Sequence, residues 1–167
     1  FSKNSGIISN NAIYFKGTKN DKIILKPIND SWGGVIIRNA KRKSLIENTL
    51  IQEINPKYLN FDNNLDGSIV FYESDVSILN SNFIKNYSED FINIINSNYY
   101  INLCNFENIY SDALDLDFSN GKILNSKFKN VKGDAIDFNY SNSHISNIKT
   151  YEISDKSISV GERSKIK

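Results

Sequence analysis

The stretch SDALDLDFS at residues 111–119 is followed 22 positions later by a near repeat, GDAIDFNYS, at residues 133–141. Extending this register in both directions places residues in matching columns 22 positions apart, of which the first is charged and the other three are apolar. The columns are Asp90, Asp112, Asp134 and Lys156; Ile92, Leu114, Ile136 and Ile158; Ile94, Leu116, Phe138 and Val160; and Ile101, Ile123 and Ile145. A fixed period of this length is typical of a solenoid, in which each repeat stacks on the next because it cannot bury its apolar face alone.

The apolar residues within each row alternate with polar ones in short runs, which indicates strands, and no stretch keeps a helical period. Three strands of about five residues, joined by Asn, Ser and Gly turns, fit one 22-residue row. We therefore predict an all-β fold, a single-stranded right-handed parallel β-helix of six to seven coils that forms one domain over residues 1–167. Upstream, the stretch GSIVFYESDVSILNSNF places Val70 and Ile78 in matching roles, with one residue of slippage.

The first third of the chain is less regular. NAIYFKG, DKIILKP and GGVIIRNA read as strands, and residues 55–66 are predicted to leave the coil as an excursion that walls a groove. The last row stops in mid-repeat at Lys167, and we expect the natural chain to continue beyond it and to carry further domains.

The chain contains 26 Asn, 26 Ile and 21 Ser residues. Asn80, Asn125 and Asn147 recur after the second strand of a coil, with Leu103 interrupting them. A second series recurs at the next turn and comprises Asn86, Asn108 and Asn130. Stacked amides at such turns can bond one another and the backbone. A general compositional bias would explain the abundance of Asn but not this register.

Charge and composition exclude several functional classes. The formal net charge is +1, which leaves no overall field to hold nucleic acid. No apolar run reaches the length of a membrane span. Cys104 is the single cysteine, so no intramolecular disulfide forms, and its setting indicates a structural thiol.

Strand alternation predicts a crowded acidic face. If Leu114 and Ile136 fill the interior, their neighbours Asp115, Asp117 and Asp137 point outward, together with Asn139. Like charges at this spacing raise a pKa or demand a cation. Residues expected beside them on the same face are Phe71, Glu73, Asn93, Ile95, Ser159 and Gly161. Alternatively, this is only a polar face that Arg163 partly neutralises, with Lys156 and Asp134 as an ion pair at its edge.

The rows SDALDLDFS, GDAIDFNYS and SISVGERS, each followed by an I-x-N or I-x-x-N strand, resemble the pectin-lyase-like β-helix superfamily with its short β-helix repeats. Within it they are most similar to the polygalacturonase group of glycoside hydrolases, over about residues 67–167. The resemblance implies that Asp112 and Asp134 are the motif carboxylates. The chain departs from the pattern at Ala135, where the family has a second carboxylate, and at Lys156, where it has a histidine.

Lyases of the same superfamily imply a different arrangement, in which outward carboxylates hold a calcium ion beside a basic residue. By this resemblance Asp115, Asp117 and Asp137 would be the calcium ligands, with Asn93 or Asn139, and Arg163 would be the base.

The functional expectation is a secreted or cell-surface β-helix, of the kind found on bacterial surfaces, that interacts with an extracellular polysaccharide. If it is an enzyme, a lyase or hydrolase acting on an acidic glycan is expected. The candidate catalytic residues are Asp112, Asp134, Asp137, Arg163 and Lys156, and the candidate substrate-binding residues are Phe71, Glu73, Asn93, Asp115, Asn139, Ser159 and Glu162. The alternative is a non-enzymatic structural or adhesive solenoid, which the missing histidine and paired carboxylate favour.

Overall fold

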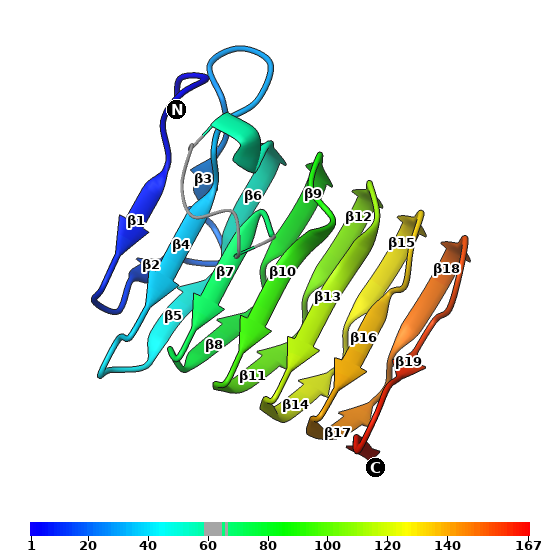
Figure 1. Ribbon diagram of the computed structural model, residues 1–167. Coiled ribbons are helices and arrows are strands. Elements are labelled where there is room, and N and C mark those ends of the chain that lie inside the picture. Colours follow the sequence, from blue (N-terminus) through cyan, green and yellow to red (C-terminus); the bar gives the residue numbers. More distant parts are fainter. Residues whose placement is uncertain (59–64, 66) are drawn as a thin grey trace.

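The protein is a right-handed parallel β-helix with three sheets and about six turns (Figure 1). The computed structural model describes residues 1–58, 65 and 67–167. Sheet A contains β1 (Ile7–Ser9), β4 (Val35–Arg38), β7 (Ile69–Tyr72), β10 (Asp90–Ile95), β13 (Asp112–Asp117), β16 (Ile136–Asn139) and β19 (Ser159–Val160). Sheet B contains β2 (Tyr14–Lys16), β5 (Ser44–Glu47), β8 (Val76–Leu79), β11 (Asn98–Asn102), β14 (Asn120–Leu124), β17 (Asn142–Ser146) and β20 (Lys165–Ile166). Sheet C contains β3 (Ile23–Leu25), β6 (Thr49–Ile54), β9 (Asn82–Asn86), β12 (Asn105–Ile109), β15 (Lys127–Val131) and β18 (Lys149–Ile153).

The register of sheet A confirms the 22-residue repeat. Asp90 is the partner of Asp112, and Leu114 is the partner of Ile136. Leu114 and Ile136 are fully buried, as the alternation predicted. Beyond these columns, the core contains phenylalanines of sheet C that stack from turn to turn, with ring centroids 4.8 Å apart in the pairs Phe83–Phe106 and Phe106–Phe128. Sheet A thus has a continuous apolar inner face, while the outward positions of β13 and β16 carry polar side chains.

The expectation that Phe71 lies on the outer face is wrong. Phe71 is the partner of Ile94 and is fully buried in the core, while its neighbour Val70 is the partner of Asn93. The offset between β7 and β10 is 23 residues rather than 22. Because side chains alternate along a strand, one extra residue in the turn exchanges the inner and outer positions.

Asparagine recurs because each turn passes through a left-handed backbone conformation. Asn80, Asn125 and Asn147 have φ values of 46°, 48° and 52°, a region that Asn tolerates better than most residues. Their amides also bond between turns, since Asn147 Nδ2 donates to Asn125 Oδ1 at 2.8 Å. Asn86 does not belong to its predicted series, because it is buried and Lys85 occupies the left-handed position.

Buried serines form a second set of ladders that the sequence analysis did not anticipate. At the turn from sheet A to sheet B, the backbone N–H of Ser97 donates to Ser119 Oγ (3.2 Å), and that of Ser119 donates to Ser141 Oγ (3.0 Å). Each hydroxyl in turn donates to the carbonyl two residues before it. At the next turn Cys104 takes the place of a serine, and its S–H lies within donating distance of the Asn102 carbonyl (3.4 Å) and the Ile78 carbonyl (3.5 Å). Burial raises the pKa of this thiol to about 12, as suits a structural role.

Helical structure is minimal in the described part of the chain. The 3-10 helix η1 (Pro56–Tyr58) begins the excursion predicted at residues 55–66, most of which lies outside the described residues. No helix among the described residues is long and apolar enough to cross a membrane.

Candidate functional site

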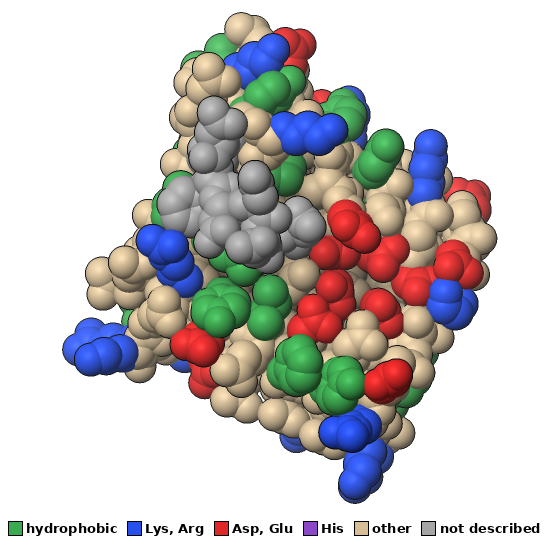
Figure 2. All heavy atoms as spheres, viewed as in Figure 1, with side chains coloured by type: hydrophobic (Ala, Val, Ile, Leu, Met, Phe, Trp, Pro, Cys, Tyr) green, Lys and Arg blue, Asp and Glu red, His purple; other side chains and the backbone are tan. Residues whose placement is uncertain are grey.

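Acidic side chains gather on the outer face of sheet A, over β10, β13 and β16 (Figure 2). They form two columns that run across the strands. The first column contains Asp90, Asp112 and Asp134, and the second contains Asn93, Asp115 and Asp137. Asp117 and its partner Asn139 follow at the ends of their strands. We call these eight residues the acid face.

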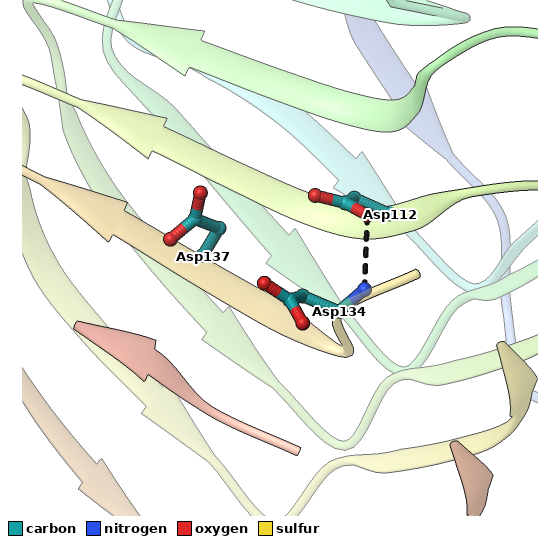
Figure 3. Close-up of side chains that lie close together, drawn as sticks. All are labelled: Asp112, Asp134 and Asp137. Atoms are coloured by element: carbon teal, nitrogen blue, oxygen red, sulfur yellow. Dashed lines mark hydrogen bonds between the residues drawn. The ribbon is translucent and has the colours of Figure 1, made fainter. Parts of the chain in front are cut away.

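The first column is built into the backbone of the turns. Asp112 Oδ1 accepts a hydrogen bond from the backbone N–H of Asp134 at 2.9 Å (Figure 3). Asp134 Oδ1 accepts one from the N–H of Lys156 at 2.7 Å. Gly133 permits this approach, because a Cβ atom there would lie 1.9 Å from Asp112 Oδ1. Asp112 and Asp134 therefore have a structural role, because each carboxylate joins its own turn to the backbone of the next turn.

Asp137 completes a compact group with the first column. Asp112, Asp134 and Asp137 each place one oxygen within 4.8 Å of the other two (Figure 3). This is closer than the roughly 6.5–9.5 Å between the carboxyl groups of inverting glycosidases and nearer the roughly 5–5.5 Å of retaining ones. The spacing also fits calcium, since two ligands about 2.4 Å from one ion are at most about 4.8 Å apart. The predicted calcium ligands were Asp115, Asp117 and Asp137, of which only Asp137 belongs to this group.

Asn93 links the two columns. Its Nδ2 donates to Asp90 Oδ2 and to Asp115 Oδ2, both at 3.2 Å. Asn93 is only 6% exposed. Its Oδ1 and the Oδ1 of Asp115 are buried and have no hydrogen-bond partner among the residues that the structure describes. Buried acceptors without partners are costly, so both atoms favour a ligand that donates.

Burial and mutual repulsion raise the pKa of several of these carboxyl groups. Burial, and next the charge of Asp115, raises the pKa of Asp90 to about 9. Burial, and next the charges of Asp117 and Asp137, raises the pKa of Asp115 to about 7. The pKa of Asp112 is also raised, chiefly by burial. The acid face therefore holds protonated and ionised carboxyl groups side by side at neutral pH, as acid–base chemistry requires.

Basic residues lie only at the border of this surface. Lys156 Nζ is 3.1 Å from Asp134 Oδ1 and 2.6 Å from Asp155 Oδ2, which confirms the predicted ion pair with Asp134. Arg163 lies in the turn after β19, with its guanidinium over the Tyr140 ring, 5.7 Å from the centroid. Among the described residues it forms no salt bridge with a carboxylate, contrary to the expected neutralising role.

The remaining predicted binding residues are divided between the strands and the turns. Ser159 is the partner of Asp137, so it continues the second column. Glu73 lies in the turn after β7, where its Oε1 accepts a bond from Asn96 Nδ2 at 3.4 Å. Glu162 lies in the turn after β19 and accepts a bond from the Tyr140 hydroxyl at 2.7 Å. Only Asn93, Asp115, Asn139 and Ser159 therefore share the strand face with the catalytic candidates.

An exposed aromatic pair borders the acid face and was missed in the sequence. Phe118 and Tyr140 directly follow Asp117 and Asn139, and their rings stack with centroids 4.8 Å apart and planes 17° apart. They remain 56% and 36% exposed, respectively, and Figure 2 shows two neighbouring hydrophobic side chains just below the acidic cluster. In the sequence, the pair is marked by two aromatic residues that are 22 positions apart. Both have a left-handed backbone conformation in the turn, where the side chain points away from the core.

Comparisons with known proteins do not assign the chain to a family. No family model matches the chain, and no curated protein matches it. Among solved structures, the chain is similar to QnrB1, a plasmid-mediated fluoroquinolone resistance protein, with 9% identity and a TM-score of 0.22. The similarity covers 95% of this chain and 92% of that one. A likeness at this level carries no argument about function, which must rest on the geometry of the acid face.

Proposed function

We propose that the acid face binds a polysaccharide across successive turns of sheet A and cleaves its glycosidic bonds. The observation that carries the proposal is the close group of Asp112, Asp134 and Asp137 on the same side of the molecule as the exposed Phe118–Tyr140 stack. The carboxyl groups supply an acid and a base. The aromatic rings supply a flat apolar surface, which packs well against the C–H groups of a pyranose ring.

Asp112 and Asp137 are the reacting pair in this proposal. Both are partly exposed, whereas the side chain of Asp134 is 8% exposed and is held by Lys156. Asp112 Oδ1 is occupied by the Asp134 N–H, so Oδ2 carries the proton that Asp112 donates to the leaving oxygen. Asp137 supplies the carboxylate that attacks the anomeric carbon or stabilises its positive charge. Asp134 and Lys156 position Asp112 and the turn below it.

The proposal includes an extracellular site of action, secreted or on the cell surface, because structural polysaccharides lie outside cells. Further domains of a longer chain would then anchor the solenoid. Asp112, Asp134 and Asp137 are candidate calcium ligands, and a calcium ion bound there would add positive charge next to a bound glycan.

Release of reducing ends from a panel of neutral, acidic and amino-sugar polysaccharides tests the proposal, with calcium and with EDTA. We expect the wild-type protein to cleave at least one polymer and Asp137→Asn to lose the activity. The exposed Asp21, in the turn before β3, offers the matched control Asp21→Asn, which should remain active. Activity that survives in Asp137→Asn would contradict the assigned pair.

A non-enzymatic structural solenoid is the second candidate. The hydrogen bonds from backbone N–H groups to Asp112 and Asp134 favour it, because they give both carboxylates a role in joining successive turns. It predicts that Asp112→Asn lowers the stability of the fold while no polysaccharide in the panel is cleaved by the wild-type protein.

A further inference from the structure

The acid face presents hydrogen-bond acceptors and negative charge, and few basic side chains lie near it to neutralise that charge. Asp112, Asp115, Asp117 and Asp137 lie on adjacent strands. Among the described residues, Lys156 makes the only salt bridge to this surface, and it is already shared between Asp134 and Asp155. A uronate-bearing glycan would bring further negative charge to this surface, and like charges across an interface oppose binding. The acidic glycan expected from the sequence is therefore a poor electrostatic match.

The unsatisfied atoms at this surface point to a ligand that donates hydrogen bonds. Asn93 is more than nine-tenths buried, and its Oδ1 has no partner in the described part of the chain. Asn93 Nδ2 bonds to Asp115 Oδ2, and the buried Oδ1 of Asp115 also has no partner there. The Oδ1 of Asn93 can only accept, and the Oδ1 of Asp115 accepts when this carboxyl group is ionised. An ammonium group offers three donors and a positive charge, so it would satisfy these acceptors and reduce the repulsion among the carboxylates.

The aromatic pair favours a sugar over a bare metal ion as the source of that positive charge. Phe118 stands three residues after Asp115, directly beyond the end of β13, so the two residues are at most about 10 Å apart along the chain at about 3.3 Å per residue. The Tyr140 ring is held in place by its hydroxyl bond to Glu162 and by Arg163 on its face. A metal ion would leave the two rings unused, whereas a short oligosaccharide spans the distance from the rings to the carboxylates.

We propose that the acid face selects glycans that carry free amino groups, such as polymers of deacetylated glucosamine, with the ammonium groups bound by the aspartates and a sugar ring on the Phe118–Tyr140 stack. This rests on the proposed function and narrows its substrate class. Acetylation of the amine removes the charge, and so it removes the main attraction while it leaves the sugar ring unchanged.

Calorimetric titration with two oligosaccharides of equal length, a glucosamine tetramer and an N-acetylglucosamine tetramer, tests the selectivity at mildly acidic pH. We expect the glucosamine tetramer to bind at least about tenfold more tightly, and the preference to weaken as salt screens the charges. Asp117→Asn should reduce the preference, whereas Phe118→Ala should weaken both tetramers by a similar factor. Asp21→Asn is again the matched control and should behave as the wild type.

The outcomes separate this inference from the proposed function. Equal binding of the two tetramers, or tighter binding of a galacturonate oligomer with or without calcium, would overturn the preference for amino sugars while glycan binding stood. Calcium binding without any binding of either tetramer would identify the acid face as a metal site and overturn the inference. A protein that binds and cleaves no glycan at all would overturn the proposed function itself.

Discussion

The buried carboxyl group of Asp90 should make the stability of the fold depend on pH. Asp90 is 4% exposed, and burial with the charge of Asp115 raises its pKa from 3.8 to about 9. Between these values the folded protein keeps a proton that the unfolded chain has released. The free energy of unfolding therefore falls as the pH rises through this range, and it is highest at the acidic end.

The size of the effect follows from the shift. One pKa unit corresponds to about 1.4 kcal/mol, so roughly three pH units from 4 to 7 remove about 4 kcal/mol of stability. This is a large part of the roughly 5–15 kcal/mol that stabilises a typical domain. Asp90→Asn keeps an acceptor oxygen for the 3.2 Å bond from Asn93 Nδ2 but has no charge to bury. We expect this variant to be more stable than the wild type at pH 7, by up to about 4 kcal/mol.

Urea unfolding followed by circular dichroism measures both quantities. The wild type, Asp90→Asn and the control Asp21→Asn are compared between pH 5 and pH 8 in buffer with EDTA, which removes cations that the aspartates bind. The wild type and the control should lose stability with rising pH, and Asp90→Asn should lose clearly less. A wild-type stability that stays level or rises over this range, or an Asp90→Asn protein that is the least stable of the three at pH 8, would refute the reasoning.

Substitutions at three further positions test the packing and the turns. Leu114→Ala removes a fully buried side chain from the centre of sheet A and should cost about 2–5 kcal/mol, seen as a lower urea midpoint with an unchanged slope. Gly133→Ala places a Cβ atom against Asp112 Oδ1, so it should break the bond to the Asp134 N–H and speed hydrogen exchange at that amide. Asn125, at φ 48°, separates two effects: Asn125→Gly loses only the amide ladder, while Asn125→Ala also strains the backbone and should be about 1 kcal/mol less stable than Asn125→Gly. Equal stability of the two Asn125 variants would show that the left-handed turn imposes no strain.

The repeat made the fold predictable from the sequence. With a constant offset of 22 residues, the pairing of Asp90 with Asp112 and the inward direction of Leu114 follow from counting alone. The same counting failed at Phe71, because a single extra residue in the turn before β10 reverses the face. Periodicity locates a side chain only as far as the turns keep their length.

The site was predicted less completely than the fold, because its properties depend on contacts between columns. The outward position of Asp115 follows from alternation, but its bond to Asn93 and the unpaired oxygen on each residue depend on side-chain conformations. Arg163 was placed beside the carboxylates by its position in the row, yet the left-handed turn directs it onto Tyr140. Serine was read as a turn former, so its buried ladders were not expected.

The connections between the sheets differ in how much their lengths vary from turn to turn. Nine residues separate β3 from β4 and 14 separate β6 from β7, whereas two separate β12 from β13, all at the passage from sheet C to sheet A. The passages from sheet A to sheet B vary only between two and five residues, and serines fasten the later ones. Insertions are thus accommodated at the corner where Asp90 and Asp112 begin their strands and Asp134 precedes β16. Evolution can remodel the border of the acid face at this corner without disturbing the stacked turns that hold its aspartates.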